Sequence, residues 1–334
     1  MVTRRNFTFA ASAAALSAFV PMSVAEAAIA ETPQAVFNRP ITLIVPFAKQ
    51  GATDQVARLI AEPLGKALGV AVTVENITGD WGTTGAVIAA HAAADGHTLI
   101  MGQTATHVMP SQRGVARYDA VADFTPIGLV GSAPITFVVN NDFPVKNLED
   151  LYAYIKVYPQ PMAIAHGGFG TPSHIGARKL KAAFRAPLLT ERTYASTMAA
   201  LQDVAEGRVE MMATSLSQAL PFIKAGKVKA VGLAATSRNI VLPEVFTGTQ
   251  QGFADLRASH WNGLFAPKGL SAAMQQKLAD GLSAALADAS TARKMRELGI
   301  HVPFAEQQGP DQLALLQQRE RQDLQVDIQQ AVAV

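Results

Sequence analysis

Two short loops of the chain have the composition of an anion-binding site. Residues 47–54 read Phe-Ala-Lys-Gln-Gly-Ala-Thr-Asp, and residues 166–174 read His-Gly-Gly-Phe-Gly-Thr-Pro-Ser-His. Each follows an apolar run and precedes an amphipathic one, so each is expected to lead from a strand into a helix whose first N–H groups lack a partner. A carboxylate needs several such donors, and the Thr171 and Ser173 hydroxyls could add two. Capping by Thr53 or Asp54 is a simpler role and does not exclude a ligand.

Residue patterns for other kinds of chemistry are missing. The chain has no Cys, and neither the Gly-x-x-x-x-Gly-Lys phosphate loop nor the Gly-x-Gly-x-x-Gly dinucleotide pattern occurs in it. The chain has 7 His, of which His166 and His174 are close in sequence, but no His-Glu-x-x-His pattern occurs, so no metal or other cofactor is expected. No Gly-x-Ser-x-Gly elbow is present. If the chain were an exported enzyme on a small acid, His174 or Asp54 would have to act as its base or nucleophile.

Three further side chains could face a binding cleft. Trp81 lies in a second Gly-rich loop, Tyr194 precedes a helical stretch, and Lys49 could pair with an acidic ligand. The alternatives are that Trp81 packs on a neighbouring helix and that Lys49 is a solvated loop residue. A Trp81 ring that faces the cleft would favour an aromatic or otherwise flat carboxylate, because stacking adds to area burial.

Alternating strands and helices are expected to position these loops. Short β-rich runs alternate with amphipathic stretches and Gly-containing turns, which predicts an α/β fold with a mostly parallel sheet covered on both faces. Expected strands are 41–46, 70–75, 98–101, 135–140, 162–165, 188–189, 211–213 and 228–235, and expected helices are 54–68, 86–94, 103–107, 148–157, 173–184, 197–206, 219–225, 272–286, 289–298 and 310–331.

The first thirty residues have the pattern of a secretory signal peptide. Arg4 and Arg5 precede an apolar stretch, and small-x-small cleavage sites occur at residues 25–27 and 28–30. A retained membrane anchor is the alternative, although the apolar run is about half the length that spans a bilayer. The paired arginines match a twin-arginine signal as well as a general secretory one, and both export routes stay open. Without Cys, no lipoprotein anchor can form.

Length and charge narrow the class of protein further. Removal of residues 1–30 from the 334-residue chain leaves 304 residues, more than a single core usually supports, so two domains are expected. The formal net charge is +2, with no cluster of basic residues, which argues against a nucleic-acid partner.

A series of short motifs resembles the Bug receptors, the TctC-like substrate-binding components of tripartite tricarboxylate transporters. The motifs occur in the family's order from about Arg39 to the C-terminus. They include 39–47, 51–54, 57–58, 74–76, 82–85, 95–99, 123–127, 170–174, 225–227, 261–267 and 298–299.

The resemblance implies a two-lobed periplasmic-binding-protein fold of the Venus flytrap, type II-like kind. Two strands would cross between the lobes, near residues 132–134 and 254–259. Lobe one would comprise residues 31–133 and 255–334, and lobe two residues 134–254. In this family the first loop usually holds a ligand carboxylate. Together with the analysis of the loops, the expected ligand-binding residues are Phe47, Lys49, Gly51, Thr53, Asp54, Trp81, Thr104, Thr106, Gly170, Thr171, Ser173, His174, Tyr194 and Thr214.

Four departures from the family pattern leave the identity of the ligand open. Lys49 and Gln50 replace small residues of the first loop, and Trp81 stands where the family usually has Gly. Glu191-Arg192 stands where the family usually has His-Val, and Thr214 stands where the family commonly has Asp.

The expected protein is therefore an exported, periplasmic receptor and not an enzyme. Its expected partners are a di- or tricarboxylate, or an aromatic carboxylate, and integral-membrane transporter subunits. It is expected to be monomeric, with no cofactor and no nucleic-acid partner. A ligand sensor for a signalling system, or an exported enzyme of the same architecture, stays open as an alternative.

Overall fold

The computed structural model describes residues 37–109 and 117–332, with side chains described up to residue 324. The chain separates into two units, residues 1–34 and 35–334. The predicted signal peptide falls in the first unit, outside the described residues. Within the described residues, no helix has the length and hydrophobicity needed to cross a bilayer.

The first sheet of the second unit has three parallel strands, β1 (Ile41–Val45), β2 (Val72–Asn76) and β3 (Thr98–Gly102), in the order β2-β1-β3. Strand β9 (Ser259–Pro267) pairs antiparallel with β3. The connecting and covering helices are α1 (Ala52–Leu68), η1 (Asp80–Gly82), α2 (Thr83–Ala90), α3 (Thr104–His107), α8 (Ala272–Ala287), α9 (Ala289–Glu297), α10 (Ala305–Gln308) and α11 (Pro310–Val332).

The second sheet contains β5 (Met162–His166), β6 (Leu189–Thr193), β7 (Met211–Ser215) and β8 (Val228–Leu233). Strand β5 pairs parallel with both β6 and β7, which places β5 between them. The helices of this part are α4 (Leu148–Val157), α5 (Pro172–Phe184), α6 (Thr197–Ala205), α7 (Leu216–Lys224) and the short η3 (Thr249–Gln251).

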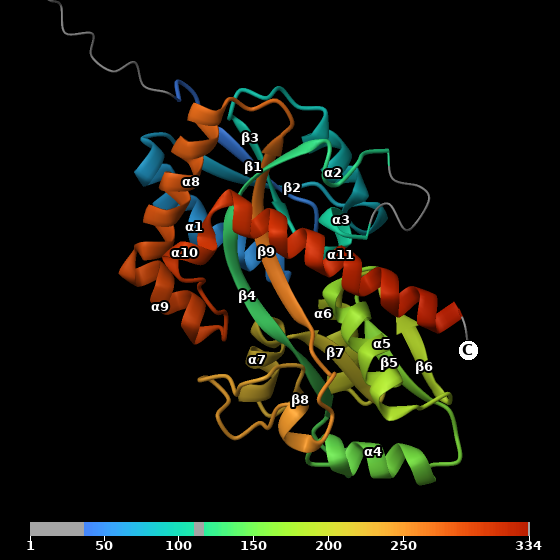
Figure 1. Ribbon diagram of the computed structural model, residues 1–334. Helices are drawn as coiled ribbons and strands as arrows, with labels where there is room; N and C mark the ends of the chain where they lie inside the picture. The colour runs from blue at the N-terminus through green and yellow to red at the C-terminus, as the bar shows by residue number, and fades with distance from the viewer. Residues whose placement is uncertain (1–36, 110–116, 333–334) are drawn as a thin grey trace, which may run out of the picture. The chain divides into compact units, whose positions relative to one another are not determined.

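One long strand, β4 (Phe124–Asn140), belongs to both sheets (Figure 1). Its residues 124–134 pair with β9, and its residues from Ile135 onward pair with β7 and β8. Next to this change of partner, the Ile135 N–H donates to the Ala258 carbonyl oxygen. The protein therefore has the predicted two-lobed fold with strands that run between the lobes, whereas the exact lobe boundaries stay a prediction.

Each lobe has its own hydrophobic core. In lobe one, the buried face of α1, with Ile60 and Leu64, packs with Leu43 of β1 and Leu282 of α8. In lobe two, Phe137 of β4 packs with residues of α5 and β6, including Phe184 and Leu189. Separate apolar clusters in the two lobes explain how a chain of this length buries its apolar residues without a single oversized core.

Residues 124–131 of β4 were not predicted as a strand, although a strand was expected to cross between the lobes near residues 132–134. Residues 124–134 include Pro126, Gly128, Gly131 and Pro134, which normally interrupt strands. The register of β4 against β9 shifts between Pro126 and Gly128 and again between Leu129 and Gly131. These bulges accommodate the strand-breaking residues, a tertiary feature that local sequence preference does not reveal.

Candidate functional site

A cavity of about 180 Å³ lies where loops of the two lobes meet. It is smaller than the roughly 300–1,000 Å³ pockets that take drug-sized ligands, and its volume equals that of about six water molecules. A small organic acid fits this size. The residues that line it are Phe47, Ala48, Lys49, Gln50, Gly51, Ala52, Thr53, Gln103, Gly167, Thr171, Pro172, Ser173, Ala195, Ser196, Thr197, Met198, Ser215, Gln218 and His260.

The N-terminal ends of four helices reach this cavity. Helix α1 comes from lobe one, and α5, α6 and α7 come from lobe two; residues at the start of each line the cavity. Each of these helices follows a strand of a parallel pair, and such βα connections leave the strands at the same edge of the sheet. The arrangement directs four partly positive helix ends toward one small volume.

Helix α1 leaves backbone donors available at its start. Its N-cap residue Gly51 has no side chain that could cap the helix, and the first N–H to bond a carbonyl in the helical manner belongs to Gln55. The N–H groups of Ala52 and Thr53 therefore have no partner within the helix. Both residues line the cavity, where these groups can bind an anion.

The loop before α1 is held by Asp54 and Asn76. Asp54 Oδ2 accepts the Gln50 N–H at 2.8 Å, and Asp54 Oδ1 accepts Asn76 Nδ2 at 2.8 Å. The same Asn76 nitrogen lies 3.0 Å from the Phe47 carbonyl oxygen, to which it also donates. Gln50 has a left-handed φ of 66°, which these bonds help to maintain. Asp54 is buried and does not line the cavity, so it positions the loop that does.

The ionisation of Asp54 follows from the same contacts. Burial raises the pKa of Asp54, but hydrogen bonds from Arg58, Asn76 and the Gln50 N–H more than offset this, so that its pKa lies below the ordinary value. A carboxyl group whose pKa is lower in the folded state stabilises the fold above its unfolded pKa of about 3.9. That contribution is lost as the pH falls through the folded-state pKa.

Asp54→Asn is expected to lower the free energy of unfolding at pH 7 by about 1.5 to 3 kcal/mol, because several hydrogen bonds to a charged group are lost or weakened. The difference from the unchanged protein should shrink as the pH drops below about 4. Urea unfolding between pH 7 and 3 measures both effects, with the exposed Asp142→Asn as a control. If the difference in free energy of unfolding between Asp54→Asn and the unchanged protein does not change with pH, this role of Asp54 is contradicted.

The hydroxyls of the second loop are used within the loop. Thr171 Oγ1 donates to the Gly168 carbonyl oxygen at 2.6 Å and accepts the His174 N–H at 3.3 Å. Ser173 Oγ therefore supplies the proton of the 2.9 Å contact between the two hydroxyls, and it accepts the Gly167 N–H at 3.0 Å. Both hydroxyls line the cavity, but a proton from Ser173 reaches a ligand only if its bond to Thr171 breaks.

Gln218 is a lining residue that the sequence analysis missed. It lies in the first turn of α7, its side chain is buried, and its Nε2 has no hydrogen-bond partner among the described residues. A buried amide that donates no bond is costly unless a ligand or water accepts from it. The sequence does contain a signal for Gln218, because this residue follows β7 in the same strand-to-helix pattern as the two predicted loops.

His260 of β9 also lines the cavity, with its Nε2 3.2 Å from Thr53 Oγ1. Burial lowers the pKa of His260 to about 4, although a hydrogen bond with Asn262 opposes the shift. At neutral pH the ring is therefore uncharged. Among the described residues that line the cavity, Lys49 is the only Lys or Arg and none is Asp or Glu. Backbone N–H groups at the helix starts add partial positive charge to that of Lys49.

Six of the predicted residues are brought together at the cavity: Phe47, Lys49, Gly51, Thr53, Thr171 and Ser173. The other eight do not line it: Asp54, Trp81, Thr104, Thr106, Gly170, His174, Tyr194 and Thr214.

Several of these eight have structural partners. Thr104 Oγ1 donates to Glu320 of α11 at 3.1 Å, Thr106 Oγ1 donates to the Gln103 carbonyl oxygen at 3.2 Å, and the Tyr194 hydroxyl donates to Asp203 at 2.7 Å.

Trp81 lies at a contact between the lobes and not in the cavity wall. Its backbone φ is 50°, and its side chain is 42% exposed. A Cβ atom placed on Gly168 of the second loop would lie 2.2 Å from Trp81 Cδ1, so the indole ring rests directly on that glycine. The ring does not offer a stacking surface to a ligand in this cavity, which removes the condition for a preference for aromatic acids.

The family model of the tripartite tricarboxylate transporter family receptor matches residues 56–329. The chain belongs to this family. The predicted resemblance to the Bug receptors is thereby confirmed.

Relatives and solved structures of this receptor agree with the family. It is 31% identical over 278 residues to a UPF0065 protein of Agrobacterium vitis, covering 83% of this chain and 80% of the relative, and 30% identical to BugT of Bordetella pertussis, covering 69% and 71%. MatC from Rhodopseudomonas palustris with bound malate superposes with a TM-score of 0.81 at 36% identity, covering 87% of this chain and 99% of MatC. The periplasmic binding protein BugD gives a TM-score of 0.79 at 32% identity, covering 86% and 95%.

Proposed function

We propose that this receptor captures a small dicarboxylate in the cavity between its lobes and delivers it to the membrane subunits of a tripartite tricarboxylate-type transporter. The observation that carries the proposal is the convergence of four helix N-termini on a cavity whose described lining has no carboxylate side chain. A carboxylate there receives charge-assisted hydrogen bonds. A cationic ligand would meet the partly positive helix ends and the Lys49 ammonium.

Donors on opposite sides of the cavity favour an acid with two carboxylates. One carboxylate would bind the Ala52 and Thr53 N–H groups of lobe one, and the other would face Gln218 and the starts of α5, α6 and α7 in lobe two. A ligand with an anionic group at each end interacts better with the closed pair of lobes than with either lobe alone. Only this difference in affinity can drive closure. The malate bound to MatC supports a ligand of this class, as does adipate in a second R. palustris structure (TM-score 0.81, 25% identity).

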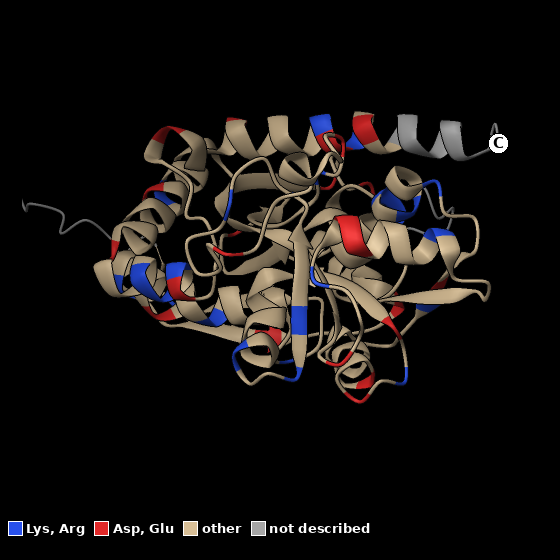
Figure 2. Ribbon diagram, turned by 90° about the horizontal axis from the view of Figure 1, so that it is seen from below, with Lys and Arg blue, Asp and Glu red and all other residues tan. Residues whose placement is uncertain are grey.

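The cellular setting of the proposal follows from the family and the N-terminal residues. The receptor would work in the periplasm as a monomer, after export by either the twin-arginine or the general secretory route. Figure 2 shows basic and acidic residues interspersed over the helices and loops, in keeping with the expectation of no nucleic-acid partner. The receptor would release its ligand unchanged, as a binding protein and not an enzyme.

Calorimetry tests this function directly. The protein is unfolded in denaturant, freed of carried-over ligand by dialysis and refolded, and is then titrated with malate, succinate, adipate, citrate and benzoate. We expect a dicarboxylate to bind with the highest affinity and to be recovered chemically unchanged. Succinamide, which has the same length but no charge, is the matched control and should not bind. Binding of succinamide as tight as that of succinate, or no binding of any acid, would overturn the proposal.

A further inference from the structure

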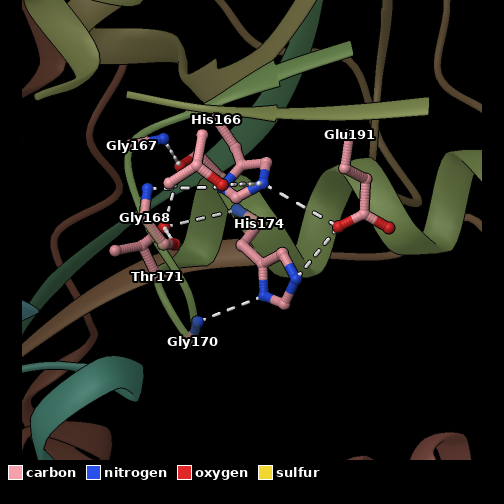
Figure 3. A network of polar contacts seen from close by, with 9 residues as sticks. His166, Gly167, Gly168, Gly170, Thr171, His174 and Glu191 are labelled. Atoms are coloured by element: carbon pink, nitrogen blue, oxygen red, sulfur yellow. Dashed lines mark hydrogen bonds and ion pairs between the residues drawn. The ribbon is translucent and has the colours of Figure 1, made fainter. Parts of the chain in front are cut away.

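Three ionisable side chains, two of them buried, form a cluster next to the second loop (Figure 3). His166 ends β5, His174 lies in the first turn of α5, and Glu191 lies on β6. His174 Nε2 is 3.1 Å from Glu191 Oε2, His166 Nε2 is 3.8 Å from the same oxygen, and the two imidazole centroids are 4.7 Å apart. Both imidazoles are buried, and the Glu191 side chain is 28% exposed. None of the three lines the cavity.

The loop itself contacts the other nitrogen of each imidazole. The Gly168 N–H donates to His166 Nδ1 at 3.3 Å, and the Gly170 N–H donates to His174 Nδ1 at 3.1 Å. A ring nitrogen that accepts a hydrogen bond carries no proton, so each neutral ring has its proton on Nε2. His174 Nε2–H then donates to the Glu191 carboxylate, while His166 Nε2 lies 3.4 Å from Thr193 Oγ1.

The charge states agree with this hydrogen-bond pattern. Burial lowers the pKa of His166 to about 4, with a further contribution from His174, although Glu191 opposes the shift. The hydrogen bond from His174 lowers the pKa of Glu191 despite its partial burial. At neutral pH an ionised Glu191 therefore faces an uncharged His166.

The same three groups could also be considered as a metal site, since their ligand atoms all lie within 4.8 Å of one another. A His bound to a metal through Nε2 normally donates its Nδ1–H to an acceptor. Here each Nδ1 faces a backbone N–H, which is a donor, and a protonated Nδ1 would oppose it. The backbone of the loop therefore favours a hydrogen-bonded cluster over a metal site.

We propose that Glu191 is a positioning residue of the ligand-binding loop: by accepting the Nε2–H of His174, it fixes the ring orientation in which Nδ1 holds the Gly170 N–H. The loop between the two His residues includes Gly167 and Thr171, which line the cavity. Glu191 thus acts on the cavity from behind, through His174 and the loop. Its effect on affinity rests on the proposed function. The tautomers of His166 and His174 and the protection of the Gly170 amide do not depend on it.

In β6 only Leu189 is buried, so the fold does not require an apolar residue at Glu191. A carboxylate at this site has a defined partner in His174.

The test compares Glu191→Leu, which removes the acceptor, with Glu191→Gln, which keeps one. The exposed Glu244→Leu of the same lobe is the matched control. Long-range ¹H–¹⁵N spectra of the ligand-free protein should show an unprotonated Nδ1 and a protonated Nε2 for both His residues. In Glu191→Leu, we expect His174 to lose this single tautomer, hydrogen exchange at the Gly170 amide to become at least about tenfold faster, and malate affinity to fall about tenfold. Glu191→Gln should restore most of the protection of the Gly170 amide and most of the malate affinity.

Each part of the proposal can fail separately from the proposed function. A protonated Nδ1 on His174, or Gly170 exchange that Glu191→Leu leaves unchanged, would overturn it whether or not any acid binds. Added Zn²⁺ that shifts both Nε2 signals at stoichiometric concentration would identify a metal site instead and would also overturn it. A protein that binds no acid, yet shows the expected tautomers and the Glu191-dependent exchange, would refute the proposed function while leaving the positioning role intact.

Discussion

Gln218→Glu is expected to weaken binding of a dicarboxylate by at least about 100-fold, equivalent to about 2.7 kcal/mol. The substitution keeps the size of the side chain but replaces a buried donor, which has no partner among the described residues, with an anion. Like charges inside a small cavity repel, and the new carboxylate would occupy the helix ends that would otherwise stabilise a ligand carboxylate. Calorimetric titration with malate measures the loss.

Two further variants separate charge from the loss of a donor. Gln218→Leu removes the donor without adding charge and is expected to weaken binding only about tenfold. Gln312→Glu adds the same charge at an exposed position of α11 and should leave affinity unchanged. Equal affinities for Gln218→Glu and the unchanged protein would show that Gln218 does not face the ligand.

Gly168→Ala is expected to lower ligand affinity at least about tenfold by opposing the closed arrangement of the lobes. Gly168 has a φ of 115°, which residues with a Cβ atom adopt only with strain, and the added Cβ would lie 2.2 Å from Trp81 Cδ1. Because Trp81 and Gly168 belong to different lobes, separation of the lobes relieves the clash but not the backbone strain. The clash should therefore lower ligand affinity. The backbone strain should lower the free energy of unfolding by about 1 to 3 kcal/mol.

A double substitution distinguishes these two effects. Trp81→Ala combined with Gly168→Ala removes the obstructing ring, so affinity should recover to that of Trp81→Ala alone while the loss of stability remains. Gly226→Ala is the matched control, because Gly226 also has a positive φ, 64°, but no atom of the described part of the chain lies within 4 Å of its added Cβ. It should lower stability and leave affinity unchanged. An affinity loss in Gly168→Ala that Trp81→Ala does not relieve would contradict the contact between the lobes.

Local sequence patterns predicted the two loops because their position depends on neighbouring residues. A β-rich run, a Gly-containing turn and an amphipathic stretch together specify a strand, a loop and a helix start, and residues 47–53 and 171–173 do line the cavity. The same local logic predicts the helix starts of lobe two. It does not show which of them converge, because this depends on the order β7-β5-β6 in the sheet.

Distant contacts determine which residues line the cavity without having been predicted, and which predicted residues do not line it. His260 reaches the cavity because β9 runs along β4 between the lobes, and its partner Thr53 is 207 positions away in the sequence. Thr104 was predicted in the site, but its hydroxyl is bonded to Glu320, which lies 216 positions away. Asp54 is at the predicted helix start, yet Arg58 and Asn76 draw its carboxylate away from the cavity.

A crystal structure with malate bound tests the central claim most directly. We expect one carboxylate of malate to lie within hydrogen-bonding distance of the Ala52 and Thr53 N–H groups of lobe one. The other should accept a hydrogen bond from Gln218 Nε2 of lobe two, with the lobes closed around the ligand. A malate bound outside this cavity, or one whose carboxylates contact only one lobe, would contradict capture between the lobes.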